Sequence, residues 1–94
     1  MSKEKSIEYI KRAMDCIDEL PFSDNGMLAF YDLEIAVKEL EDWKMSVLIS
    51  PEAYKKLLQG DLNWLFKQPE SLEKDHIEAI LKNLIKRIDE GKDF

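Results

Sequence analysis

Glu73 and His76 are the residues best suited by type to hold a metal ion, and they lie three positions apart on a predicted helix. A Glu-x-x-His pair is part of the ligand set of di-iron helical bundles, which use two such pairs and two further glutamates. His76 is the only histidine, so one chain cannot complete that set. We therefore expect no metal and no cofactor, and interpret His76 as a histidine at the solvent edge near a helix start.

Cys16 is the only cysteine, and its neighbours in sequence do not favour a nucleophile. A reactive cysteine needs a nearby base or the positive end of a helix. Cys16 instead lies near the predicted end of the first helix beside Asp15, Asp18 and Glu19, which raise the pKa of its thiol. We expect a small, partly buried packing residue. A lone cysteine cannot form an intrachain disulfide, which is typical of a cytoplasmic protein.

Pairs of carboxylates occur at Asp15/Asp18 and Glu39/Asp42, where general acid–base chemistry could be considered. Such chemistry needs a carboxyl group whose pKa is changed by burial or by a close partner. Both pairs fall on predicted polar helix faces. The sequence also has no nucleophile motif, no glycine-rich phosphate loop and no zinc-ligand spacing. We therefore expect a protein that is not an enzyme.

The charge of the chain is negative and unevenly distributed. The 94 residues carry a formal net charge of −6, and residues 13–42 contain nine acidic residues against one base, Lys38. This balance argues against binding of nucleic acid through phosphates and permits attraction to a basic protein surface. A solvated acidic surface is the simpler alternative. We find neither an apolar run long enough for a membrane span nor a signal peptide, and expect one domain over residues 1–94.

The central predicted helix, residues 26–43, has apolar side chains on two sides. Its broad face consists of Ala29, Phe30, Leu33, Ala36, Val37, Leu40 and Trp43. A narrower row, Leu28, Tyr31 and Ile35, lies nearly opposite, among Asp32, Glu39 and Asp42. A helix with two apolar faces either lies between neighbouring helices or presents one face to a partner. The narrow row is covered in the first case and exposed in the second.

Three further helices are predicted around this one. The first spans residues 2–20 and is stopped by Pro21. Ser23 or Asp24 begins the central helix, and Ser50-Pro51 begins a helix over residues 51–67 that we expect to be kinked or interrupted at Gly60. If it breaks there, Asp61 caps a separate piece. The last helix starts after Ser71 or Asp75 and stops at Gly91. These elements predict an all-α fold, a small antiparallel bundle of four or five helices.

A protein-binding module is the function that this pattern favours, as an inhibitor, immunity or adaptor protein that engages a basic partner surface through the first two helices. The residues assigned to that surface are Leu28, Tyr31, Asp32, Ile35, Glu39 and Asp42. Small acidic helical proteins include immunity proteins, phage-borne inhibitors and DNA mimics, an analogy of fold and charge alone. One alternative is a structural protein that self-associates into a homodimer through the narrow row. Another is a small-ligand or metal site led by Glu73 and His76.

Overall fold

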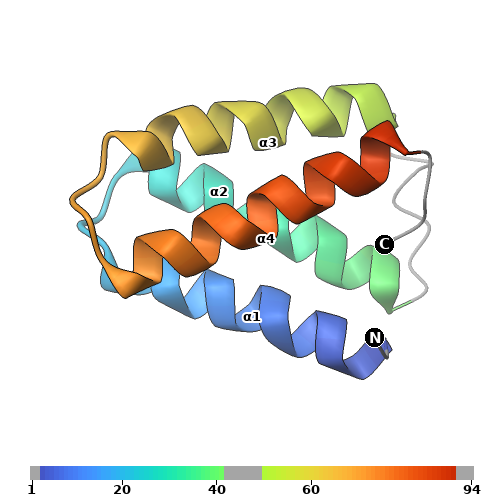
Figure 1. Ribbon diagram of the computed structural model, residues 1–94, viewed down its shortest axis with the longest axis horizontal. Coiled ribbons are helices and arrows are strands. Elements are labelled where there is room, and N and C mark those ends of the chain that lie inside the picture. Colours follow the sequence, from blue (N-terminus) through green and yellow to red (C-terminus); the bar gives the residue numbers. More distant parts are fainter. Residues whose placement is uncertain (1–2, 42–49, 91–94) are drawn as a thin grey trace.

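The computed structural model describes residues 3–41 and 50–90, which form four α-helices. They are α1 (Lys3–Glu19), α2 (Asp24–Leu40), α3 (Pro51–Phe66) and α4 (Leu72–Asp89), and the described residues contain no strand. Successive helices run in opposite directions, and each packs against two neighbours, in the cyclic order α1, α2, α3, α4 (Figure 1). The predicted all-α antiparallel bundle is confirmed, with four helices. None of these helices is long and apolar enough to cross a membrane.

A serine begins each of the last three helices. The side-chain oxygens of Ser23, Ser50 and Ser71 accept hydrogen bonds from the amides of Gly26, Ala53 and Lys74 at 3.0, 3.2 and 3.1 Å. Each bond satisfies a donor that the first helical turn leaves without a partner. The serine alternatives at these helix starts are therefore confirmed. The expectations for Trp43, for the end of the central helix beyond residue 41 and for Gly91 lie outside the described residues.

Helix α3 is continuous through Gly60, so the predicted interruption at this position is wrong. Gly60 lies on an exposed part of α3, and a β-carbon built there meets no atom within 4 Å. Asp61 does not cap a separate helix and is instead buried within α3. A glycine weakens a helix by about 1 kcal/mol. The burial of Tyr54, Leu58 and Leu65 on one face of α3 outweighs that cost.

The four helices enclose one hydrophobic core. From α2 it takes Ala29, Leu33, Ala36, Val37 and Leu40, so the broad apolar face predicted for the central helix is buried over its described part, with Phe30 half-buried at its edge. The remaining buried apolar residues are Ile10, Ala13 and Ile17 of α1, Tyr54, Leu58, Trp64 and Leu65 of α3, and Ile77, Leu81 and Leu84 of α4. Trp64 is thus a core residue.

Candidate functional site

The corner between α1 and α2 exposes several large apolar side chains. We define the α1–α2 corner as Phe22, Met27, Leu28 and Tyr31, and Phe22, Leu28 and Tyr31 are 86%, 57% and 54% exposed. A hollow of about 260 Å³ at this corner is lined by residues that include Phe22, Met27, Phe30 and Tyr31. Exposed apolar side chains are common singly, but a group of them around a hollow is typical of a binding surface.

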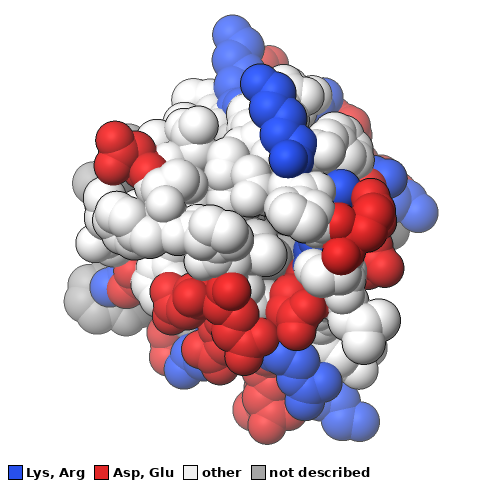
Figure 2. All heavy atoms as spheres, turned by 90° about the vertical axis from the view of Figure 1, so that its left-hand side faces the viewer, with Lys and Arg blue, Asp and Glu red and all other residues white. Residues whose placement is uncertain are grey.

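Acidic side chains border this corner. Asp18 lines the hollow, and Asp18, Glu19 and Asp24 are all exposed. Figure 2, which looks onto the end of the bundle that carries the α1–α2 and α3–α4 connections, shows a broad uncharged region with Asp and Glu side chains gathered below it. The corner therefore combines apolar contact area with a negative border.

The residues that the sequence assigned to the binding surface differ in their exposure. Leu28 and Tyr31 are exposed, whereas Ile35 and Glu39 are half-buried, with Ile35 packed against the core. Asp42 lies outside the described residues. Asp32 is 8% exposed and does not lie on the surface where the sequence pattern placed it. It follows Ala29 by three residues and precedes Ala36 by four, so it shares the buried side of α2 with both alanines.

Asp32 belongs to a buried polar cluster between α2 and α3 that the sequence analysis missed. The Tyr54 hydroxyl donates a hydrogen bond to the main-chain carbonyl oxygen of Asp32. Burial raises the pKa of the Tyr54 hydroxyl, and the nearby Asp32 and Asp61 raise it further. The phenol is therefore neutral and acts as a hydrogen-bond donor. Its bond joins the backbone of α2 to a side chain of α3.

Asp61 is the second buried acid of this cluster and is 5% exposed. Burial, a hydrogen bond with Asp32 and repulsion from the Asp32 carboxylate together raise the pKa of Asp61 to about 9. Burial likewise raises the pKa of Asp32, while the hydrogen bond with Asp61 lowers it. At neutral pH the pair thus holds one proton, which forms the hydrogen bond between the two carboxyl groups. The second oxygen of Asp61, Oδ2, is buried and has no hydrogen-bond partner among the described residues.

A sequence signal for Asp61 existed. Asp61 follows Leu58 by three residues and precedes Leu65 by four, which is the spacing of a buried helix position. Asp32 has the same spacing between Ala29 and Ala36. An acid in an apolar stripe on each of two adjacent helices is the pattern that would have indicated the pair.

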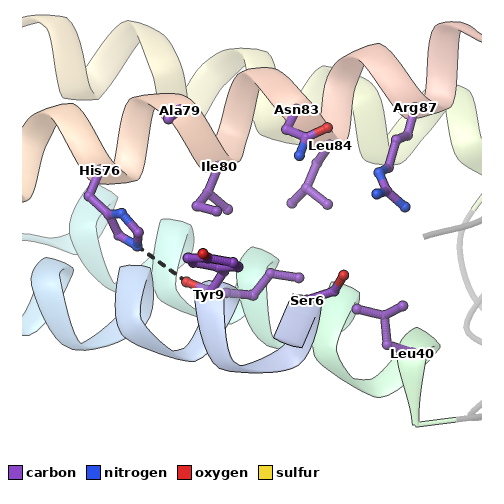
Figure 3. A pocket seen from close by; sticks show the side chains of 10 residues that line it. Ser6, Tyr9, Leu40, His76, Ala79, Ile80, Asn83, Leu84 and Arg87 are labelled. Atoms are coloured by element: carbon purple, nitrogen blue, oxygen red, sulfur yellow. Dashed lines mark hydrogen bonds between the residues drawn. The ribbon is translucent and has the colours of Figure 1, made fainter. Parts of the chain in front are cut away.

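The groove between α1 and α4 contains the only histidine of the chain (Figure 3). Its volume is about 290 Å³, and Ile10, Ile80 and Leu84 contribute to its apolar floor. His76 points towards α1, where its Nε2 lies 3.4 Å from the carbonyl oxygen of Tyr9, and Arg87 also points towards α1 further along the groove. Glu73, the predicted companion of His76, is not among the lining residues. Within residues 3–41 and 50–90, no three His, Cys, Asp or Glu side chains are arranged to hold a metal ion.

Cys16 packs at the edge of the core as a half-buried residue. Burial is the main cause that raises the pKa of its thiol, followed by the charges of Glu19, Glu73 and Asp15. The predicted direction of this shift is confirmed, although the sequence argument named only the acids. A thiol with a raised pKa is a poor nucleophile at neutral pH.

No family model matches this chain, and neither a curated protein nor a solved structure matches it. The α1–α2 corner is the surface of the described residues most suited to contact with a partner, and the Asp32–Asp61 pair is their most unusual buried group.

Proposed function

We propose that this protein is a non-enzymatic binding module of the inhibitor, immunity or adaptor type, which engages another protein through the α1–α2 corner. The exposure of Phe22, Met27 and Tyr31 around one hollow, with Leu28 exposed on the same helix, carries this proposal. A few residues supply most of the binding energy in protein interfaces, and tryptophan and tyrosine are enriched among them. Tyr31 is suited to such a role because its ring offers apolar area and its hydroxyl can donate a hydrogen bond.

The partner that fits this corner has an apolar centre and a basic border. Asp18, Glu19 and Asp24 would lie at the rim of the interface, where charge speeds association and selects between partners more than it adds affinity. The same acids disfavour nucleic acid as the partner, because its phosphates are negative.

Self-association is the second candidate, since a second copy could also cover Phe22 and Tyr31. In a two-fold dimer each surface meets an identical surface. The acids of both corners would then lie in one interface, and like charges in an interface are unfavourable. The charge of the corner thus favours a different, basic protein over a homodimer.

Quantitative affinity capture from extracts of the native host tests this proposal. Wild-type protein and the variants Tyr31→Ala and Tyr9→Ala are immobilised, and the recovered proteins are quantified at low and high salt. Tyr9 is a matched control, because it is also an exposed tyrosine with one ring contact but lies in the groove between α1 and α4. We expect one partner with a basic surface whose recovery falls at least tenfold with Tyr31→Ala, persists with Tyr9→Ala and decreases with salt. Equal recovery by all three proteins would refute a role for the corner.

A second pair of variants tests the contribution of charge. Asp24 and Glu52 are both exposed acids in the first turn of a helix, but only Asp24 lies beside the corner. Asp24→Asn is expected to slow association with the captured partner and to reduce its dependence on salt, whereas Glu52→Gln leaves both unchanged. Sedimentation of the wild-type protein at micromolar concentration distinguishes self-association from binding of a different protein. If the wild type is a dimer and Tyr31→Ala is a monomer, the partner at the corner is a second copy of this chain.

A further inference from the structure

The Asp32–Asp61 pair places two acidic side chains in the interior of the described part of the molecule. Two carboxyl groups lie between α2 and α3, each less than one-tenth exposed. Ionisation of both carboxyl groups at once is unfavourable in the protein interior, because each charge is removed from water and the two charges repel each other. Apolar residues at these positions would pack without that difficulty, and the neighbouring stripe positions Ala29, Ala36, Leu58 and Leu65 are apolar.

No cation of the described part of the molecule neutralises the pair. The one buried cation there is Lys74 of α4, and its ammonium is already held by the carbonyl oxygen of Gln68 and by a carboxylate oxygen of Glu70 at 3.0 and 2.9 Å. Asp32 and Asp61 act on each other, and both of them, together with Glu39 of α2, act on the phenol of Tyr54 in α3. The core residues that α1 contributes are all apolar.

A single shared proton therefore neutralises one of the two carboxylates, as a nearby cation would otherwise do. With one carboxyl group protonated, the pair forms a hydrogen bond across the helix interface, and only one negative charge is buried. Oδ2 of Asp61 stays without a described partner in this arrangement. The hydrogen bond from Tyr54 to the carbonyl oxygen of Asp32 holds the backbone of α2 beside the pair.

We propose that the Asp32–Asp61 pair is a proton-dependent clamp: α2 and α3 are held together while the pair shares one proton, and the interface between them opens when that proton is lost. In the ionised state two negative charges face each other in the core, and water must enter to solvate them. The opening releases the contact of α2 with Trp64, because the Trp64 ring lies against Gly26 in the same interface. Leu28 and Tyr31, which flank Asp32 on α2, then change their position relative to α3.

Carboxyl-carbon NMR of the wild-type protein tests the shared proton directly, with no variant required. Across a pH titration we expect the side-chain carboxyl signals of Asp32 and Asp61 to be coupled, with one transition near pH 9. If both carboxyl groups of the pair titrate in the ordinary acidic range of aspartate side chains, no proton is shared and the clamp does not exist.

The opening itself is followed by the indole N–H signal of Trp64, assigned by comparison with a Trp43→Phe variant. In the wild-type protein this signal is expected to shift and broaden in the same pH range as the carboxyl transition. Asp61→Asn keeps a donor towards Asp32 but cannot ionise, so its Trp64 signal should stay constant through pH 9, while Asp75→Asn behaves as the wild type. Asp32→Asn is a second variant for use if Asp61→Asn does not fold, because with one carboxyl group left two negative charges can never face each other. A Trp64 signal that responds identically in the wild-type protein and in the non-ionising variant would overturn the proposal.

Discussion

The hydroxyl group of Tyr54 in α3 donates a hydrogen bond to the main-chain carbonyl oxygen of Asp32 in α2, although the two residues are 22 positions apart in the chain. This bond joins the two helices at the point where α2 buries an acid. Tyr54 is 3% exposed, so water does not compete for its hydroxyl. The backbone of α2 and the acidic pair are thus held in one place by the same aromatic side chain.

Removal of this hydroxyl is expected to destabilise the fold. Tyr54→Phe keeps the ring in the core but leaves the carbonyl oxygen of Asp32 without this donor, which costs about 1–2 kcal/mol for a buried hydrogen bond. Urea unfolding followed by circular dichroism measures the loss. Tyr9→Phe, at an exposed tyrosine, should change the free energy of unfolding by less than about 0.5 kcal/mol. Equal effects of the two variants would mean that the Tyr54 bond contributes nothing.

The stability of the protein is expected to fall as pH rises from about 4 towards 9. The pKa of Asp61 is about 9 in the folded protein, against an ordinary value of 3.8, so between these values the folded protein binds a proton that the unfolded chain has lost. Rising pH then favours the unfolded chain, by at most about 1.4 kcal/mol per pH unit for one proton. The raised pKa of Asp32 acts in the same direction.

Asp61→Asn separates the contribution of Asp61 to the pH dependence of stability from the contributions of the other acids, because the asparagine side chain does not ionise. We expect the free energy of unfolding of the variant to depend much less on pH between 5 and 8 than that of the wild type. The stability of the variant relative to the wild type should therefore increase as pH rises. Thermal unfolding at several pH values measures both trends. Asp75→Asn, at an exposed acid of α4, should retain the wild-type slope. Parallel curves for Asp61→Asn and the wild type would contradict the raised pKa.

Much of the fold could be predicted from the sequence, because the signals involved are local. A serine at the N-cap position caps a helix through the amide three residues later, and Ser23, Ser50 and Ser71 do so. The apolar spacing of Ala29, Leu33 and Leu40 requires one buried face whatever the neighbouring helices are. The prediction at Gly60 was wrong, because the loss of helix stability caused by a glycine is small compared with the free energy gained by burial of the opposite side of α3.

The candidate sites were harder to predict, because they depend on which helix faces meet. An acid at the edge of an apolar stripe lies in water or in the core according to the neighbouring helix, and α3 buries Asp32. The same dependence leaves Leu28 and Tyr31 exposed while Ile35 packs against the core. The acid pair combines residues of two helices whose contact only the tertiary structure reveals.

Lys74 is expected to stabilise the connection between α3 and α4. Its buried ammonium donates to the carbonyl oxygen of Gln68 and to Glu70. Lys74→Met keeps the apolar stem but removes these charged hydrogen bonds, and we expect a loss of about 1–2 kcal/mol. Lys82→Met is the control, because Lys82 is exposed and its pairing with Glu78 at 3.4 Å contributes less than about 1 kcal/mol. Urea denaturation compares the two variants, and a larger loss for Lys82→Met would exclude this role for Lys74.

The same substitution at two glycines is expected to have opposite effects on stability. A β-carbon at Gly26 would lie 3.2 Å from the Trp64 ring and 3.2 Å from the capping oxygen of Ser23, so Gly26→Ala must push the ring or weaken the cap. Overpacking of this kind costs about 1–3 kcal/mol, which exceeds the gain in helix propensity.

At Gly60 a β-carbon enters open space on the exposed face of α3. Gly60→Ala should therefore stabilise the protein by about 0.5–1 kcal/mol, because alanine loses less conformational freedom in a helix. Thermal and urea unfolding of Gly26→Ala and Gly60→Ala show whether each substitution raises or lowers the free energy of unfolding. If Gly26→Ala stabilises the protein as much as Gly60→Ala does, the close approach of α2 to Trp64 is not a constraint, and Trp64 can move without loss of packing.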